Sequence, residues 1–92
     1  MYGVFYYNNW GCDCITFQKA FLKREDAISY IKTQIITDFE TDDEIFKSIS
    51  KADFDSHDVL YEDSVNCIYT NKNELHWNAT GDVDLWQIIE LK

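Results

Sequence analysis

The sequence predicts an α+β domain, in which an antiparallel sheet of about five strands carries two helices packed on one face. Three observations lead to this prediction. Segments rich in β-branched and aromatic residues lie in both terminal parts of the 92-residue chain. Two segments with apolar residues at helical spacing lie between them, and the chain contains no proline. The order strand-strand-helix-helix-strand-strand-strand is typical of helices segregated to one face of a sheet, and residues 1–92 have the length of a single domain.

The first two predicted strands form a hairpin. Residues 2–10 carry apolar side chains on both faces, as expected of a central strand. Residues 8–11 supply asparagines and a glycine for a turn. Residues 15–21 then predict the partner strand, with Ile15 and Phe17 on the same face.

The first helix is predicted over residues 23–37. Ala27, Ile31, Ile35 and Phe39 recur every four residues and form one apolar stripe. The β-branched residues near the end of this segment weaken the last helical turn.

A second helix is predicted over residues 42–52. Its apolar stripe consists of Ile45, Ile49 and Ala52. The tetrapeptide at residues 41–44 matches a capping box, in which Thr41 accepts a hydrogen bond from the amide of Glu44 and Glu44 reaches back. We therefore assign Glu44 to capping.

The last third of the chain predicts three strands, over residues 65–70, 74–78 and 83–91, with turns at 71–73 and 80–82. Within them, Leu75 and Trp77 share one face, and Trp86 and Ile88 lie opposite Leu85 and Ile89. Residues 59–61 fit either a short helical turn or an edge strand, and the pattern does not decide between them.

The charge of the chain is unevenly distributed along the sequence. The formal net charge is −9, and residues 38–63 alone hold ten acidic residues against two lysines. Solubility would be served equally well by scattered acids, whereas concentrated acids create a local field and destabilise the fold by self-repulsion. We therefore predict that nine of these acids form a partner-binding surface. They are Asp38, Glu40, Asp42, Asp43, Asp53, Asp55, Asp58, Glu62 and Asp63.

Cysteine and histidine residues suggest a second class of function. Cys12 and Cys14 lie two residues apart, and with Cys67 and either His57 or His76 they provide four candidate zinc ligands. A strong zinc signal has two ligand pairs at turn spacing, and this chain has one pair and scattered single residues. An odd number of cysteines without a secretory context predicts free thiols.

Catalytic and cation-binding patterns are weaker still. A pairing of Cys67 with His76, or of His57 with Asp58, lacks any motif that specifies a nucleophile and base. Residues 38–63 contain no glycine, and hence no calcium-binding loop of the EF-hand type. The three glycines of the chain form no phosphate-binding loop, and a charge of −9 opposes direct binding of nucleic acid. We expect neither a cofactor nor a bound metal.

These exclusions favour a basic protein partner. Carboxylates on a helix and its flanking loops can be spaced like phosphates, and the groove of a nucleic-acid-binding protein is prepared for that pattern. Aromatic residues exposed beside the acids would anchor the contact. The candidates are Phe46, Phe54 and Tyr61. The alternative is that the acids form a solvated face and all the aromatic residues lie in the core.

One stretch resembles small uncharacterised phage and prophage proteins. After an aromatic hairpin, these proteins carry a phrase like V-F-x-x-x-E-x-A-x-x-Y-I, followed by a helix. The matching stretch here is FQKAFLKREDAISYIKTQI, in which Phe21, Ala27, Tyr30 and Ile31 occupy the corresponding positions, with Glu25 or Asp26 as the acid. The resemblance covers about a third of the chain and implies a fold but no active site. In size and acidity the chain also resembles phage-encoded anti-CRISPR and anti-restriction inhibitors, several of which imitate DNA.

We therefore expect a non-catalytic inhibitor, monomeric or homodimeric, that blocks the nucleic-acid-binding surface of a host nuclease or CRISPR effector. No apolar run approaches the roughly 20 residues that a membrane span needs, and the first residues do not match a signal peptide. The expected location is the cytoplasm of the bacterial host. Two alternatives stay open: a zinc-binding or enzymatic domain, and a homo-oligomeric regulatory module that pairs through a sheet edge.

Overall fold

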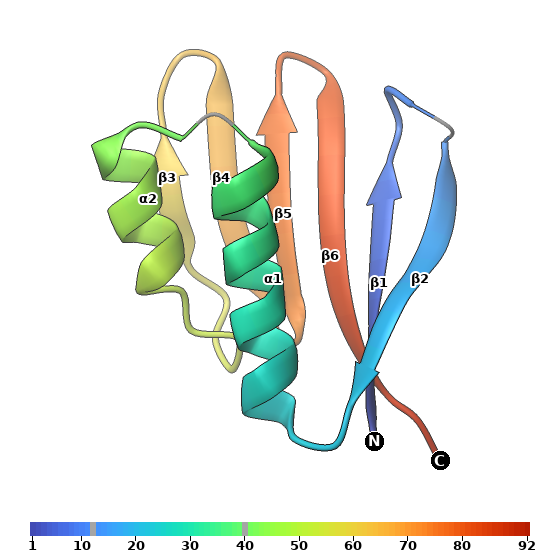
Figure 1. Ribbon diagram of the computed structural model, residues 1–92. Coiled ribbons are helices and arrows are strands. Elements are labelled where there is room, and N and C mark those ends of the chain that lie inside the picture. The colour runs from blue at the N-terminus through green and yellow to red at the C-terminus, as the bar shows by residue number, and fades with distance from the viewer. Residues whose placement is uncertain (12, 40) are drawn as a thin grey trace.

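The computed structural model of the protein describes residues 1–11, 13–39 and 41–92, and consists of one sheet and two helices (Figure 1). The elements in chain order are β1 (Tyr2–Asn8), β2 (Cys14–Phe21), α1 (Arg24–Asp38), α2 (Asp43–Ser50), β3 (Val59–Glu62), β4 (Asn66–Asn71), β5 (Glu74–Ala79) and β6 (Asp82–Glu90). The α+β class and the antiparallel sheet are therefore as predicted. No helix of the described ranges has the length and apolar character needed to cross a membrane.

The sheet has the strand order β2-β1-β6-β5-β4-β3, and every neighbouring pair is antiparallel. The first strand is central, as predicted, because β6 returns along it and pairs over its whole length, from Tyr2 with Glu90 to Asn8 with Asp84. The N- and C-terminal strands thus lie side by side in the middle of the sheet.

The described sheet contains six strands, and the prediction of about five is one too few. The additional strand is β3, which corresponds to the segment that the sequence left undecided. It is four residues long and pairs with β4 around an irregularity between Val59 and Tyr61. A strand this short offers too few alternating positions for its pattern to be distinguished from a helical turn.

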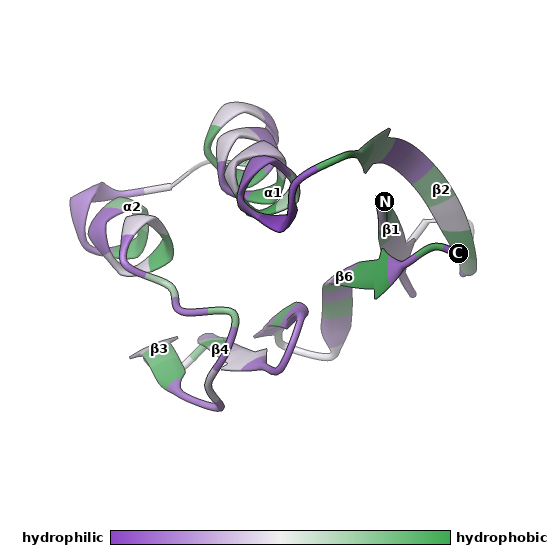
Figure 2. Cartoon of the chain, turned by 90° about the horizontal axis from the view of Figure 1, so that it is seen from below, coloured by the Kyte–Doolittle hydropathy of each residue, from purple (hydrophilic) through white to green (hydrophobic). Residues whose placement is uncertain are grey.

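Both helices lie on the same face of the sheet and turn their hydrophobic sides toward it (Figure 2). The predicted stripe of α1 is confirmed, because Ala27, Ile31 and Ile35 are fully buried. The stripe of α2 is also buried. The sheet contributes alternating residues to the same core, and their burial confirms which residues were predicted to share a face in each of the last two strands. These residues are Leu75, Trp77, Trp86 and Ile88.

The capping residue of α2 differs from the prediction. Asp42 is the N-cap and accepts a hydrogen bond from the amide of Ile45 at 2.9 Å. The capping box predicted for Thr41 and Glu44 is therefore wrong by one residue. Asp and Thr are both favoured at this position, so the sequence offered two adjacent candidates, and the burial of Ile45 fits the cap at Asp42.

Candidate functional site

The strand directions bring three turns to the same end of the molecule. The turns β1–β2, β3–β4 and β5–β6 all lie at the end where α1 finishes and α2 starts (Figure 1). The strand register shows the same arrangement, because Asn8 pairs with Asp84, and Ala79 pairs with both Asp82 and Asn66.

Hydrogen bonds connect these turns to one another. The side chain of Asn9 donates to the carbonyl of Gly81 at 2.9 Å and accepts from the amide of Val83 at 2.7 Å. The amide of Thr80 donates to the carbonyl of Val65 at 3.2 Å. The three turns therefore form one connected surface.

This surface is acidic, and we call it the acidic end. Its described acidic residues are Asp13, Asp38, Asp42, Asp43, Glu44, Glu62, Asp63 and Asp82, which are exposed, and Asp84, which is buried. The four segments that contribute them, residues 8–13, 38–44, 62–66 and 79–84, contain no lysine or arginine. These segments hold ten of the 17 acidic residues, and the seven remaining acids are matched by all eight lysines and arginines. The negative excess of the chain thus arises from these four segments.

The structure brings together five of the nine predicted binding residues. Asp38, Asp42, Asp43, Glu62 and Asp63 are all exposed at the acidic end. Glu40 lies outside the described residues. Glu44, assigned to capping from the sequence, is also exposed in the first turn of α2 and belongs to the acidic end.

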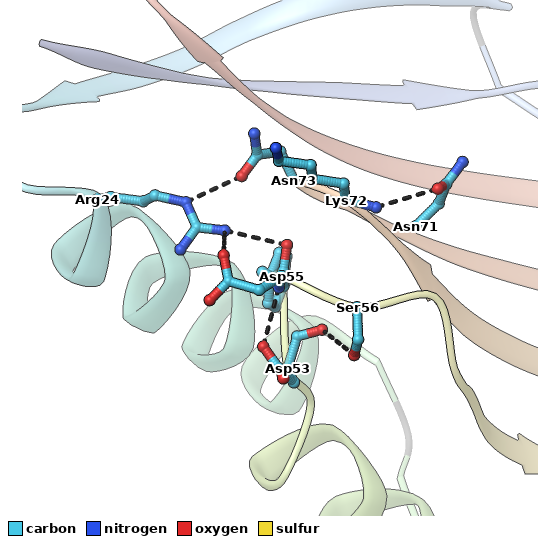
Figure 3. A network of polar contacts seen from close by, with 8 residues as sticks. Arg24, Asp53, Asp55, Ser56, Asn71, Lys72 and Asn73 are labelled. Atoms are coloured by element: carbon cyan, nitrogen blue, oxygen red, sulfur yellow. Dashed lines mark hydrogen bonds and ion pairs between the residues drawn. The ribbon is translucent and has the colours of Figure 1, made fainter.

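The other three predicted residues lie in the loop between α2 and β3, at the opposite end of the molecule (Figure 1). Asp53 accepts a hydrogen bond from the amide of Asp55 at 2.9 Å, and Asp58 accepts one from the hydroxyl of Ser56 at 2.6 Å. Asp55 forms an ion pair with Arg24 at 2.9 Å (Figure 3). These contacts shape the loop, and the ion pair balances the charge of Asp55.

Arg24 also fixes this opposite end through neutral acceptors. Its guanidinium donates to the side-chain oxygen of Asn73 at 2.9 Å and to the carbonyl of Phe54 at 3.0 Å (Figure 3). The start of α1, the loop after α2 and the β4–β5 turn are thereby joined.

At the acidic end, by contrast, three carboxylates are held by tyrosine hydroxyls. Tyr7 donates to Asp13 at 2.6 Å and Tyr61 donates to Asp63 at 2.7 Å. In the third pair the hydroxyl of Tyr6 donates to Asp84. A hydroxyl orients a carboxylate without opposing its charge, so these hydrogen bonds fix the acidic groups and leave their negative charge unbalanced.

This arrangement raises the pKa values of two of the tyrosines. The hydrogen bond to Asp63 is the main cause that raises the pKa of Tyr61 to about 12, and the negative charges of Asp42 and Glu44 contribute. Burial is the main cause of the raised pKa of Tyr6, followed by its hydrogen bond to Asp84, and the charge of Asp38 adds to it. The acids on the two helices therefore lie close enough to act on tyrosines of the sheet.

Asp63 is the most strongly constrained carboxylate of the set. The amide of Asn66 donates to it at 2.6 Å and the amide of Val65 at 2.8 Å, in addition to the hydroxyl of Tyr61. These three hydrogen bonds, with Asn66 the largest cause, lower the pKa of Asp63 to about 2. Its charge therefore persists over the whole physiological pH range.

Sequence reasoning missed three members of the acidic end, Asp13, Asp82 and Asp84. They lie far from residues 38–63 in the chain and reach the same end because connections in a meander alternate between two ends of the sheet. Following the predicted strands from one hairpin turn to the next would have placed these three residues at the same end of the sheet.

The cysteines and histidines do not come together around one point. Cys67 is a free thiol, as predicted, and burial together with the charge of Glu62 raises its pKa. Cys14 is disulfide-bonded, so the prediction of a free thiol is wrong there; Cys12 lies outside the described residues. In the part of the chain that the structure describes, no group of three or more His, Cys, Asp and Glu residues is arranged to hold a metal.

The two histidines contact aromatic and acidic neighbours. His76 stacks on Tyr69 with ring centroids 4.5 Å apart, and its Nε2 lies 2.8 Å from a carboxylate oxygen of Glu74. His57 also faces Tyr69, at 6.0 Å. In the β4–β5 register Cys67 pairs with Asn78 and not with His76. A raised thiol pKa disfavours the reactive thiolate, so this arrangement gives no support to a Cys–His catalytic pair.

Comparison of the sequence with protein-family models and with curated proteins, and of the fold with solved structures, found no match.

Proposed function

We propose that this chain is a non-catalytic inhibitor whose acidic end occupies the basic nucleic-acid-binding surface of a host defence protein, such as a nuclease or a CRISPR effector. The observation that carries the proposal is the separation of charge along the molecule. One end presents carboxylates from four segments that contain no lysine or arginine, while the rest of the chain is close to neutral.

Two features of the acidic end support recognition of a cationic groove. Its carboxylates are held by tyrosine hydroxyls and backbone amides, as Asp63 illustrates, so they are oriented before a partner arrives. Preorganised groups lose less entropy on binding. A field of one sign also accelerates encounter with an oppositely charged protein and makes that encounter sensitive to salt.

We restrict the proposed binding surface to the acidic end. Asp53, Asp55 and Asp58 lie at the other end, where Arg24 and local hydrogen bonds engage them. The proposal therefore rests on the acidic end. Asp53 and Asp58, which form no ion pair with a described basic residue, are available for a control variant.

Two triple variants with the same change of net charge test the proposal. The first neutralises Asp38, Asp43 and Asp82 to asparagine at the acidic end. The second neutralises Asp53, Asp58 and Glu90, to Asn, Asn and Gln, elsewhere on the surface. A pull-down from bacterial lysate at low and high salt first identifies the partner, and DNA competition and affinity measurements follow.

We expect the first variant to weaken partner binding by about tenfold or more at low salt, since loss of charge slows association and removes complementarity. The second variant should bind within about twofold of the wild type. Equal weakening by both variants would mean that total charge alone matters. Binding that does not change with salt, or that DNA does not displace, would refute the mimicry.

One observation favours a second candidate function, self-association through a sheet edge. The edge strand β2 exposes Ile15 (64%) and Phe17 (54%), beside Phe5 at 5.4 Å from the Phe17 ring. Exposed apolar edge strands are prone to pair with another chain. Light scattering of the purified protein distinguishes a stable oligomer from a monomer. The substitution Phe17→Lys should dissociate an oligomer formed through this edge.

A further inference from the structure

A pocket of ≈ 510 Å³ opens between the C-terminal half of α1 and the strands β1 and β6. This volume falls in the range of small-ligand sites. Its lining is aromatic on most sides, with a few polar groups. The lining residues are Tyr6, Asn8, Trp10, Gln34, Asp38, Phe39 and Trp86.

The aromatic rings of this pocket contact one another. Trp86 lies 5.1 Å from Tyr6 and 5.5 Å from Phe39 between ring centroids. Trp10 is 57% exposed, at the start of the β1–β2 turn. A cation is attracted to the electron-rich faces of such rings, most strongly to tryptophan.

A buried carboxylate makes two of these rings richer in electrons. Asp84 is 6% exposed and accepts hydrogen bonds from the hydroxyl of Tyr6 and from the indole nitrogen of Trp10, the latter at 3.0 Å. Both rings donate a hydrogen bond to an anionic group, which shifts electron density onto the ring and strengthens its attraction for a cation. Neither Asp84 nor Asp38 forms an ion pair with any described lysine, arginine or histidine.

The wall of the pocket holds an acceptor without a donor. The side-chain oxygen of Gln34 is buried and has no hydrogen-bond partner among the residues that the structure describes. Buried acceptors of this kind are rare in native structures and call for an explanation. Gln34 lines the pocket and is only partly buried, so a turn of its side chain would bring this oxygen to an N–H group of a bound ligand.

We propose that this pocket binds an alkylammonium group that carries at least one N–H. The rings of Tyr6 and Trp10 contact the cation, and the buried ring of Trp86 lies behind Tyr6. Asp38 at the rim balances its charge, and Gln34 accepts its hydrogen bond once its side chain has turned. The inference rests on the pocket alone and does not require the proposed inhibitory function. The same group occurs in free amines and in lysine side chains, and the experiment separates these two sources.

Two pairs of probes differ in charge at nearly constant shape. The first pair is n-butylammonium and 1-butanol, which represent the free group. The second pair is Nα-acetyl-lysine N-methylamide and Nα-acetyl-norleucine N-methylamide, which represent a side chain on a peptide. Binding is followed by tryptophan fluorescence and by the NMR shifts of the Gln34 side-chain amide and the Trp10 indole N–H.

We expect at least one ammonium probe to bind about tenfold more tightly than its neutral partner. Binding of butylammonium without the blocked lysine identifies a free amine, and binding of both identifies a side chain. The pocket assignment is overturned if neither cation shifts these resonances, or if the neutral probes bind as well as the charged ones.

Two variants confirm the location. Trp10→Ala and Asp38→Asn change exposed side chains outside the buried core, and each should weaken binding of the cation by about fivefold or more. Glu90→Gln, at the other end of β6, removes the same charge as Asp38→Asn and should leave binding unchanged. Unaltered binding in both pocket variants, with native-like NMR spectra, would place the cation elsewhere and refute the proposal.

Discussion

Asp38 is placed where a carboxylate lowers the stability of the fold, and its neutralisation should therefore stabilise the protein. It is the last residue of α1, whose last turn carries no basic residue. The C-terminal end of a helix is partially negative, and an acid there costs roughly 0.3–1 kcal/mol. Asp38 is exposed, and it forms no ion pair with a described basic residue that would offset this cost.

Repulsion from the rest of the acidic end adds to that cost. Eight other described acidic residues share the acidic end with Asp38. Two unit charges about 10 Å apart in water repel by roughly 0.4 kcal/mol, and screening at 0.15 M salt reduces this to roughly 0.1 kcal/mol per pair. With the helix contribution, Asp38→Asn should raise the free energy of unfolding by about 1 kcal/mol, which corresponds to about 4–8 °C in Tm for a domain of this size.

Urea denaturation at 10 mM and at 1 M NaCl measures the effect. The stabilisation should be larger at low salt and should shrink at 1 M, where the Debye length is about 3 Å. Glu90→Gln removes one charge at the balanced end and should change stability by less than about 0.5 kcal/mol at either salt concentration. A neutral or destabilising Asp38→Asn at low salt, or an equal gain in the Glu90 control, would refute the reasoning about the acidic end.

Two further predictions concern the groups that hold each end of the molecule. Tyr61→Phe should raise the pKa of Asp63 from about 2 toward its usual 3.8, measured by carboxyl NMR; because the folded-state pKa is depressed, the stability that Asp63 contributes is present above about pH 4 and is lost as the pH falls toward 2. A pKa that stays at about 2 would mean that the backbone amides alone hold it. At the opposite end, Arg24→Ala should destabilise the fold by about 1–3 kcal/mol in urea denaturation. The substitution leaves the side-chain oxygen of Asn73 without its donor, and the carbonyl of Phe54 keeps only the amide of Asn73 as a donor. Asp55→Asn should cost less than about 1 kcal/mol, because Asp55 is 73% exposed, and equal costs would contradict this ranking.

The periodic elements of this fold could be predicted from the sequence because their patterns are local. Ala27, Ile31 and Ile35 recur at helical spacing, and all three are buried. The edge strand β3 could not be predicted, because four residues held by one neighbour carry too little periodicity. The N-cap of α2 was placed one residue early for a different reason, since Thr41 and Asp42 both carry a side-chain acceptor.

Only part of the candidate site could be predicted, because the residues that form it come from distant parts of the sequence. Residues 38–63 were treated as one group, but α2 and the loop that follows it lead from the acidic end to the opposite end, so the acids before and after α2 lie at different ends (Figure 1). Asp42 and Asp43 reach the acidic end, whereas Asp53 and Asp55 reach the end that Arg24 balances. The direction of each element, and not its position in the chain, decides which charges meet.

The two ends of the molecule use different chemistry to hold their carboxylates, and this difference supports our proposal that the acidic end binds a partner. At one end the guanidinium of Arg24 forms an ion pair with Asp55. This pair contributes to stability and balances the charge of Asp55. At the other end neutral donors hold the carboxylates: tyrosine hydroxyls for Asp13 and Asp63, and a hydroxyl with an indole for Asp84. A fold optimised for stability alone would place a lysine or arginine among these acids. Their arrangement instead preserves an outward negative field, at the cost in stability that Asp38→Asn measures.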